Sequence, residues 1–581
     1  MPTRLQRLFP PLVWLRGYQR HTLAQDILAA CIMTVLVIPQ SLAYALLAGL
    51  PPETGLYASI LPLLGYALFA SSRTLAIGPV ALIALMSATA VGSIVDQGLA
   101  GYGAASLALA LLSGVILFCM GAARLGFIAN FISHPVISGF ITGSALVIIV
   151  SQLGSLFGVD TRGANVIALL RSLWTNLASF SLATLAIGGS VIVFLVLARR
   201  FARRLLESMK LPPTVASTLA RLAPMVAVVA TSLLAAGMQL DSQGVAVIGN
   251  LPQGLPPLAI PQVTWTLLEA LVVPAFLISL VIFVESTSIA HRMAARRGER
   301  LDPNQELMGL GAANVTAAFT GGLAVAGGFS RSVVNDEAGA QTQMASVFTA
   351  IGIGLVTVFF SGLFYFLPEA TLAATIIVAV TTLVDLRGLK DTWRYSRQDG
   401  MALVATLLVT LLIGITEGIV VGVGLSLLLY LYRTSRPHIA IVGRIPGTEH
   451  FRNEKRYQVE TDHRVVIMRV DEAIYFANAQ YLEDRIGGVI RQRPEATDLI
   501  LMCTGVNTID ASALDILDTI NTRLQGAGLR FHLSEVKGPV MDKLQTTRFM
   551  ANLSGRVFLS TFEAWHTLTV RPPQTTTEVA P

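Results

Sequence analysis

The chain has 581 residues, which is too long for one ordinary soluble domain, and 53% of them are apolar while only 13% are charged. Its mean hydropathy is +0.66. Soluble proteins carry about 25% charged residues, so these values exclude a single water-soluble globule. They also exclude a disordered chain.

The charged residues divide the chain into two parts. The first 437 residues contain 43 of them and the last 144 contain 33, with net charges of +7 and −1. We therefore expect a cytoplasmic segment over residues 1–22, a transmembrane domain over 23–436, a soluble domain over 437–570 and a disordered tail over 571–581. The positive charge needs no nucleic acid, because basic residues in cytoplasmic loops account for it.

Apolar segments long enough to cross a bilayer recur from Leu23 to Leu431. A coarse count gives about fourteen, some of them short or broken. The clearest are Ile27–Leu47, Ser106–Gly121, Leu182–Leu197, Leu267–Val284, Ser346–Phe366 and Ala402–Leu431, the last of which is long enough for two.

Basic residues fix the expected orientation, because they follow alternate spans. The loops between these positions are poor in them: residues 51–55 have only Glu53 and residues 240–262 only Asp241. The positive-inside rule then predicts a multi-pass protein of the cytoplasmic (inner) membrane with both termini in the cytoplasm. The basic positions are Arg73, Arg124, Arg199, Arg200, Arg203, Arg204, Arg292, Arg296, Arg297, Arg300, Arg387, Lys390, Arg394, Arg397, Arg433 and Arg436.

Two segments break the pattern, residues 75–80 and residues 321–332. Each is a short extended apolar run, followed by Gly or Pro and then by a helix-like stretch. Gly and Pro can start a half-helix in mid-membrane, whose free N–H groups need a partner. One segment lies in each half of the membrane domain, which favours an inverted-repeat transporter with its site between two half-helix N-termini. The alternative is that both are loops or kinked helices.

Arg331 is the most informative single residue. A permanent cation within a membrane segment usually marks a pathway or a partner. It follows Ser330 at a predicted half-helix start, where N–H groups, the helix dipole, a hydroxyl and a guanidinium all attract an anion. The alternatives are an ion pair with a carboxylate such as Glu285, or an Arg that reaches the interface.

Glu285 ends the apolar run Leu277–Val284. Removal from water favours the protonated form of a carboxyl group, so Glu285 is a candidate proton carrier. It could instead be the partner of Arg331, or stand at the cytoplasmic end of its helix. Gln40 and Tyr44 are four residues apart on one face of the first span, where they could contact a ligand or bond neighbouring helices.

Signals for an enzyme, a metal or a cofactor are missing. The three cysteines and eight histidines do not cluster, and no GxxxxGK[ST] phosphate loop occurs. Residues 328–332 lack the second Gly of a nucleophile elbow. We therefore expect a protein that is not an enzyme and holds no cofactor. The soluble part is predicted to be α/β, with strands at Val465–Val470, Leu499–Met502 and Leu529–Leu533 and helices at Ala479–Ile490 and Ala511–Leu524.

These residues resemble the SulP family of anion transporters (solute carrier family 26 in animals) over about Leu8 to Thr567. The C-terminal part is similar to the STAS domain of that family, with residues 509–512 at the usual strand–helix loop. The matching segments in the membrane part are residues 39–45, 53–57, 77–80, 302–307 and 328–335.

The resemblance implies fourteen transmembrane segments in two inverted seven-segment repeats, which form core and gate domains in a homodimer with elevator-like movement. It implies an anion site between the third and tenth segments. It also implies that Glu285 is the acidic position of the eighth segment that is linked to cation coupling. The implied substrate-binding residues are Gln40, Tyr44, Val80, Ala81, Phe329, Ser330 and Arg331.

The resemblance favours proton-coupled sulfate uptake by a secondary transporter of inorganic oxyanions. Sodium-coupled bicarbonate members tend to carry Thr at the positions of Ile289 and Phe329, and a sodium ion needs several oxygen ligands. The alternatives are an anion exchanger or bicarbonate carrier, a channel-like conductor, or a membrane-anchored STAS signalling protein. Ser512 corresponds to a serine that related domains phosphorylate, although Ala511 and Ala513 replace the usual Ser and Gly. These replacements favour a trafficking, dimer-contact or partner-binding role for this domain over phosphorylation of Ser512.

Overall fold

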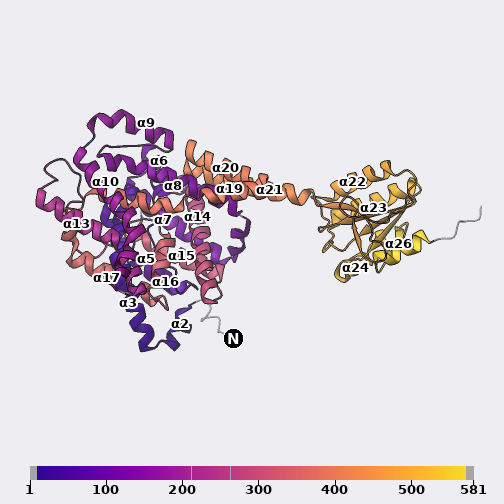
Figure 1. Ribbon diagram of the computed structural model, residues 1–581, viewed down its shortest axis with the longest axis horizontal. Coiled ribbons are helices and arrows are strands. Elements are labelled where there is room, and N and C mark those ends of the chain that lie inside the picture. The colour runs from indigo at the N-terminus through magenta and orange to yellow at the C-terminus, as the bar shows by residue number, and fades with distance from the viewer. Residues whose placement is uncertain (1–8, 132, 211, 262, 571–581) are drawn as a thin grey trace, which may run out of the picture. The chain divides into compact units, whose positions relative to one another are not determined.

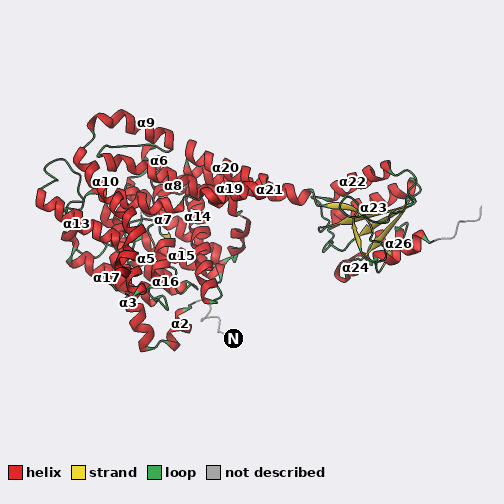
Figure 2. Cartoon of the chain, in the orientation of Figure 1, coloured by secondary structure: helices red, strands yellow, loops and turns green. Residues whose placement is uncertain are grey.

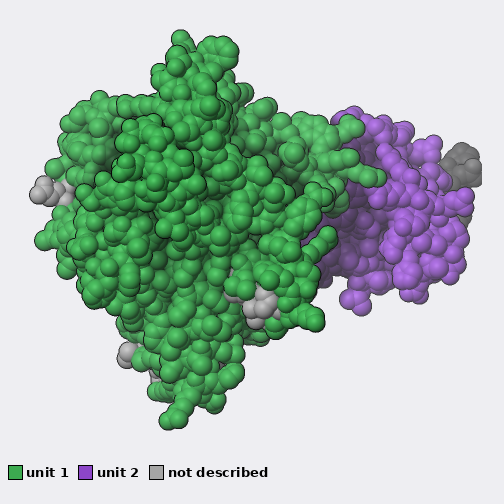
Figure 3. Space-filling model, turned by 60° about the vertical axis from the view of Figure 1, so that its left-hand side comes forward, with its two compact units in different colours: residues 1–426 green, residues 427–581 purple. Residues whose placement is uncertain are grey.

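The computed structural model describes residues 9–131, 133–210, 212–261 and 263–570. The chain forms two compact units, residues 1–426 and residues 427–581 (Figure 3). The first unit is built of helices, and the second contains a β-sheet covered by helices (Figure 2). The expected disordered tail, residues 571–581, lies outside the described residues, as do residues 1–8 of the expected N-terminal segment.

The first half of the helical unit runs from α2 to α13 and mixes long helices with shorter or broken segments (Figure 1). In chain order its elements are α2 (Pro11–Trp14), α3 (Arg20–Leu47), α4 (Pro52–Tyr57), α5 (Leu61–Phe69), β1 (Ile77–Gly78), α6 (Ala81–Asp96), α7 (Tyr102–Ala122), α8 (His134–Phe157), α9 (Val166–Asn176), α10 (Leu182–Leu197), the π-helical turn η4 (Ala198–Ala202), α11 (Arg203–Ser208), α12 (Pro213–Arg221) and α13 (Ala223–Met238).

The second half also has a long helix followed by a short strand and a half-helix, with one helix, α15, where the first half has α4 and α5. Its elements are α14 (Trp265–Arg297), α15 (Pro303–Ala318), β2 (Ala326–Gly327), α16 (Phe329–Glu337), α17 (Met344–Phe359), α18 (Glu369–Val380), the turn η6 (Thr381–Leu383), α19 (Leu386–Tyr395), α20 (Arg397–Leu412) and α21 (Ile415–Ser435), of which α21 continues into the second unit.

Seven helices in the described part are long and apolar enough to cross a membrane. Three shorter apolar helices, α6, α13 and α17, join them. The predicted span Ala402–Leu431 is two helices, since α20 ends at Leu412 and α21 begins at Ile415. The predicted span Ser346–Phe366 is shorter than expected, because α17 ends at Phe359 and a 3-10 turn follows.

The breaks predicted at residues 75–80 and 321–332 are present as two-residue strands followed by helices. Each comes after a long helix with an internal proline, Pro39 in α3 and Pro274 in α14. The strands pair with each other, antiparallel, which brings together two segments from opposite halves of the unit. This arrangement is that of an inverted repeat with discontinuous helices.

The second unit has a six-stranded sheet in the order β4-β3-β5-β6-β7-β8. The strands from β5 to β8 are mutually parallel, and β3 is antiparallel to β4 and β5. Separate apolar cores cover the two faces of the sheet. The predicted strands and helices are confirmed, with these bounds: β3 (Ile439–Arg444), β4 (Phe451–Asn453), β5 (Val465–Val470), α22 (Ala479–Gln492), β6 (Asp498–Met502), α23 (Ala511–Gly526), β7 (Arg530–Ser534), α24 (Gly538–Leu544), α25 (Arg548–Asn552), β8 (Val557–Phe558) and α26 (Thr561–Thr569).

Candidate anion site

Two half-helices begin beside a two-residue β-ladder. Ile77 pairs with Gly327 in this ladder, and α6 and α16 start shortly after the two strands. Neither helix has a side-chain cap at its N-terminus. A Cβ atom added to Gly328, the N-cap of α16, would lie 3.5 Å from Cγ1 of Val80, the N-cap of α6. The positive ends of two helix dipoles and their free N–H groups therefore lie close together.

Polar side chains from the second half of the unit hold the backbone before β1. Asn335 donates to the Thr74 carbonyl at 3.0 Å, and the Ser332 hydroxyl accepts from the Ala76 amide at 3.0 Å. Gln343 donates to two further carbonyls of this segment. These bonds satisfy backbone groups that no helix or sheet satisfies, as a broken helix in a membrane requires.

Glu306 and Ser286 complete this support. The Glu306 carboxylate is fully buried and accepts hydrogen bonds from the amides of residues 71 and 72, at 2.9 and 2.6 Å, and from the Tyr66 hydroxyl at 2.6 Å. Ser286 accepts from the Gly327 amide at 2.8 Å and so fixes β2. The segment 302–307, which resembles a family motif, thus anchors the entry to β1.

Arg331 bridges the two half-helices from the first turn of α16. Its side chain is buried, and its Nη2 donates to the Pro79 carbonyl at 2.9 Å and to Oε1 of Gln40 at 3.4 Å. Nη1 donates to the Ile77 carbonyl at 3.3 Å. Nε is buried and has no hydrogen-bond partner among the described residues. Within that same part of the chain Arg331 makes no ion pair with Glu285, so the expected alternative of a charge pair is not seen in this conformation.

Gly78 makes room for this bridge. A Cβ atom at residue 78 would lie 2.0 Å from Nη1 of Arg331, a separation that real Cβ atoms do not adopt. The backbone φ of Gly78 is +152°, which also favours glycine. The glycine of the first break and the arginine of the second are therefore parts of one arrangement.

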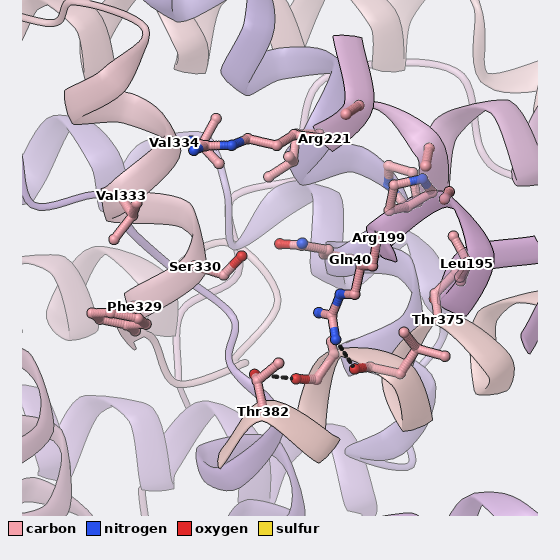
Figure 4. Close-up of a pocket in the computed structure, with 18 of the residues that line it drawn as sticks. Gln40, Leu195, Arg199, Arg221, Phe329, Ser330, Val333, Val334, Thr375 and Thr382 are labelled. Atoms are coloured by element: carbon pink, nitrogen blue, oxygen red, sulfur yellow. Dashed lines mark hydrogen bonds between the residues drawn. The ribbon is translucent and has the colours of Figure 1, made fainter. Parts of the chain in front are cut away.

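A cavity of about 510 Å³ leads to this region (Figure 4). Its lining residues come from α3, α14 and α16 and from α10, η4, α11, α12, α13, α18 and η6. Figure 4 shows the side chains of Ser330 and Gln40 pointing into the same space, with Arg199 beside Gln40. The cavity thus ends at two hydrogen-bonding groups next to the half-helix starts.

Four arginines make the cavity wall cationic, namely Arg199, Arg203, Arg221 and Arg296. Glu337 is the sole carboxylate among the described lining residues, and it forms an ion pair with Arg221. Arg199 donates from Nη1 to the Val378 carbonyl at 2.9 Å. Cations that line a water-filled space raise the local concentration of anions. The sequence interpretation assigned three of these arginines to membrane topology alone, and it did not consider Arg221.

The predicted substrate-binding residues gather around the ladder. Gln40, Tyr44, Phe329 and Ser330 line the cavity. Val80, Ala81 and Arg331 are buried at the ladder itself and are not part of the cavity lining. The guanidinium of Arg292 lies over the Phe329 ring, 4.9 Å from its centroid.

Glu285 lies on α14 immediately before the serine that fixes β2. Its Oε2 atom is buried and has no hydrogen-bond partner among the described residues. It is not part of the cavity lining, and the next residue, Ser286, accepts from the Gly327 amide of β2. The carboxylate is therefore close to the site without being paired in it. Among the described residues, no group of three or more His, Cys, Asp or Glu side chains could hold a metal ion.

Residues 23–406 match the family model of the sulfate permease family, and residues 456–564 match that of the STAS domain. The chain belongs to the sulfate permease family. It is 35% identical to a probable sulfate transporter of Mycobacterium tuberculosis (strain CDC 1551 / Oshkosh) over 543 residues, which cover 93% of this chain and 94% of that protein. It is also 35% identical to the chloroplastic sulfate transporter 4.1 of Arabidopsis thaliana, over 88% of this chain and 75% of that one.

Solved structures show the same fold for this sulfate permease family member. The murine solute carrier 26 family member A9 anion transporter, in its inward-facing state, matches with a TM-score of 0.87 at 23% identity, covering 97% of this chain and 94% of that one. The transmembrane domain of a cyanobacterium bicarbonate transporter matches with a TM-score of 0.60 at 21% identity, covering 70% of this chain and 99% of that one. The fold is therefore a helical membrane domain with a C-terminal STAS domain.

In the STAS domain of this sulfate permease family member, Ser512 lies in the first turn of α23 and is exposed. The preceding Asp510 caps the helix by accepting from the Ala513 amide at 2.8 Å and also accepts from the Phe476 amide at 2.9 Å. The hydroxyl of Ser512 makes no hydrogen bond within the described part of the chain. Because Ser512 is exposed at a capped helix start, it is accessible to a modifying enzyme. Its regulatory role stays a prediction.

Proposed function

We propose that this protein is a secondary active transporter of inorganic oxyanions that takes up sulfate together with protons. One observation carries the proposal: a cationic cavity ends at Ser330 and Gln40 beside two uncapped half-helix N-termini. The relatives described as sulfate transporters support sulfate as the anion.

The donors at the end of the cavity suit a tetrahedral oxyanion. Ser330 offers a hydroxyl, and the first turns of α6 and α16 offer backbone N–H groups. Arginine has only donors, so its contact with Gln40 occupies the amide oxygen and leaves the Gln40 NH₂ group for a ligand. Arg331 lies behind the cavity lining, where its buried guanidinium adds positive charge next to the proposed site.

Glu285 is the proposed proton carrier. Its buried and unpaired oxygen is a site where a proton removes the cost of a desolvated charge. Its neighbour Ser286 holds β2 through the Gly327 amide. A change of charge on Glu285 would therefore act on β2, next to the anion site. Such an effect of one site on the other is what coupling requires.

We assign the helices that line the cavity to the core and gate domains that the family resemblance implies. Movement of the core, with α3, α14 and α16, past the gate, with α10, α12, α13 and α18, would carry the anion across the membrane. The arginines of the cavity wall support a cytoplasmic opening of the cavity, by the positive-inside rule. The full proposal is a homodimer in the cytoplasmic (inner) membrane with cytoplasmic termini and an elevator-like movement.

Radiolabelled sulfate uptake into proteoliposomes tests this function. With an imposed pH gradient and no sodium, we expect saturable accumulation that unlabelled sulfate inhibits and bicarbonate does not. Accumulation only against an internal anion would favour an exchanger, inhibition by bicarbonate a bicarbonate carrier, and non-saturable flux a channel. A complete lack of anion flux in a well-folded preparation would favour a membrane-anchored STAS signalling protein.

A further inference from the structure

A second hollow lies outside the transport cavity, between α19 and α20. Its volume is about 650 Å³. One face of α19 lines it with residues at helical spacing, and the start of α20 completes it. This hollow, which we call the α19 groove, shares no lining residue with the anion cavity.

The α19 groove combines three cations with an apolar floor. Lys390, Arg394 and Arg397 line it, and no carboxylate is among its described lining residues. None of the three cations has an ion pair or side-chain hydrogen bond within the described chain. Because unpaired neighbouring cations repel one another, the groove favours an anionic occupant.

The floor of the groove is formed by Leu389, Val404 and the ring of Trp393, and Leu386 stands 65% exposed at its rim. A small hydrated anion would pair with the cations but leave this apolar surface exposed to water. An occupant with a charged head and an attached hydrocarbon chain covers both parts. That is the chemistry of a phospholipid with an anionic headgroup.

The groove is held in shape by α20. A Cβ atom on Gly400 would lie 2.7 Å from Cε3 of Trp393, so the indole ring packs directly on the α20 backbone. Ser396 caps α20 by accepting from the Asp399 amide at 3.3 Å. The Asp385 carboxylate caps α19 through the Gly388 amide at 2.8 Å. A rigid groove loses little conformational entropy when it binds a ligand.

We infer that the α19 groove is a binding site for an anionic phospholipid of the cytoplasmic leaflet. The helix α19 forms the C-terminal end of the candidate membrane span Glu369–Tyr395 and is followed directly by α20, so it lies at one end of a span. Its basic residues place it on the cytoplasmic side, whose leaflet carries anionic lipids. A tryptophan beside cations is typical of a helix at the level of the headgroups. The inference depends on this orientation but not on which anion or proton is transported.

Native mass spectrometry of the full chain with dioleoyl phosphatidylglycerol, released from detergent, tests the inference. We expect at least one tightly bound lipid per chain, and a combined Lys390→Gln, Arg394→Gln, Arg397→Gln variant should bind it roughly a hundred-fold more weakly. Arg387→Gln is the matched control, because Arg387 lies on α19 outside the groove lining. Equal binding by the triple variant and the wild type would overturn the inference, as would equal binding of phosphatidylcholine or displacement of the lipid by millimolar inorganic phosphate.

A second measurement keeps the test sharp if the triple variant folds poorly. Brominated phosphatidylglycerol quenches nearby tryptophan fluorescence, and Trp393 is one of five tryptophans in the chain. The wild type should be quenched more strongly than Trp393→Phe, and brominated phosphatidylcholine should not reproduce the difference. Equal quenching of both proteins would remove the lipid from the groove. If the groove instead binds a protein, neither lipid produces a difference between the variants.

Discussion

Nη1 of Arg331 lies only 2.0 Å from where the Cβ of residue 78 would be. The two residues come from opposite halves of the membrane unit, so each half limits which residue the other can carry. The bridge exists only because residue 78 has no side chain.

Gly78→Ala should therefore displace the Arg331 guanidinium, lower the thermal stability and abolish sulfate uptake. Gly92→Ala is the control, because Gly92 lies on α6 with no atom within 4 Å of an added Cβ. Fluorescence-detected size exclusion after heating and uptake into proteoliposomes measure both effects. Uptake by Gly78→Ala at the wild-type level would contradict the bridged arrangement.

Ser330 and Arg331 should respond differently to substitution. Ser330 lines the cavity and leaves the bridge untouched, so Ser330→Ala should raise KM for sulfate about ten-fold without changing the melting temperature. Arg331→Ala removes a charged donor together with the bonds to two β1-segment carbonyls, so it should lose affinity about ten- to a hundred-fold and also lose stability. An Arg331→Ala protein with unchanged affinity would remove Arg331 from the site.

Glu285→Gln keeps the shape of the side chain but cannot cycle a proton. Uptake driven by a pH gradient should collapse, whereas sulfate–sulfate exchange should survive because it moves no net proton. Glu269→Gln, an exposed change on the same helix, should affect neither. Net accumulation of sulfate by Glu285→Gln under a pH gradient alone would exclude Glu285 as the proton carrier.

Substitution of Arg199 tests how much the positive electrostatic potential of the cavity wall contributes to sulfate binding. Arg199→Gln should raise KM for sulfate and weaken its dependence on ionic strength, because a cation that attracts anions into the cavity is lost. Arg200→Gln, at the next position and outside the lining, should leave both quantities unchanged. An identical salt dependence in the two variants would show that Arg199 acts only through its bond to the Val378 carbonyl.

Asp498 makes the stability of the STAS sheet depend on pH. Burial alone would raise its pKa, but hydrogen bonds from His532, Arg530 and Thr497 and the charge of Arg530 outweigh burial and lower the pKa to about 2. The stabilisation is therefore present above the unfolded pKa, near 4, and is lost as the pH falls through about 2. As the pH falls through this window, the amides of β6 and β7 in the full chain should lose protection from hydrogen exchange, measured relative to the intrinsic exchange rate at each pH. Asp498→Asn should flatten the dependence, whereas the exposed Asp484→Asn should leave it as it is.

The broken helices could be predicted from the sequence because their signals are local. Gly78 and Pro79 follow a short extended run, and Gly327 and Gly328 do the same in the second half. Gly and Pro interrupt regular backbone structure at their own positions, so each break can be located from a few adjacent residues. The strands of the STAS domain were predictable for the same reason, since alternating and apolar runs are short-range patterns.

The supports of the site could not be predicted, because they join residues far apart in the chain. The Ser332 hydroxyl accepts from the Ala76 amide, 256 residues away in the chain, and no local sequence pattern near either residue predicts this hydrogen bond. The position of Arg199 and Arg221 in the cavity wall could not be predicted either. Their charge identified a loop side, but their place in the cavity depends on how distant helices pack and rotate. Arg331 was recognised, whereas its use of backbone carbonyls as partners was not.

The two-residue ladder also bears on what each half of the membrane unit lacks alone. Its strands come from opposite halves of the membrane unit, and in the described sheets β1 and β2 pair only with each other. One half alone thus leaves its strand edge open and its half-helix without the facing tip. The site therefore needs both halves of the membrane unit, and neither half can hold it alone.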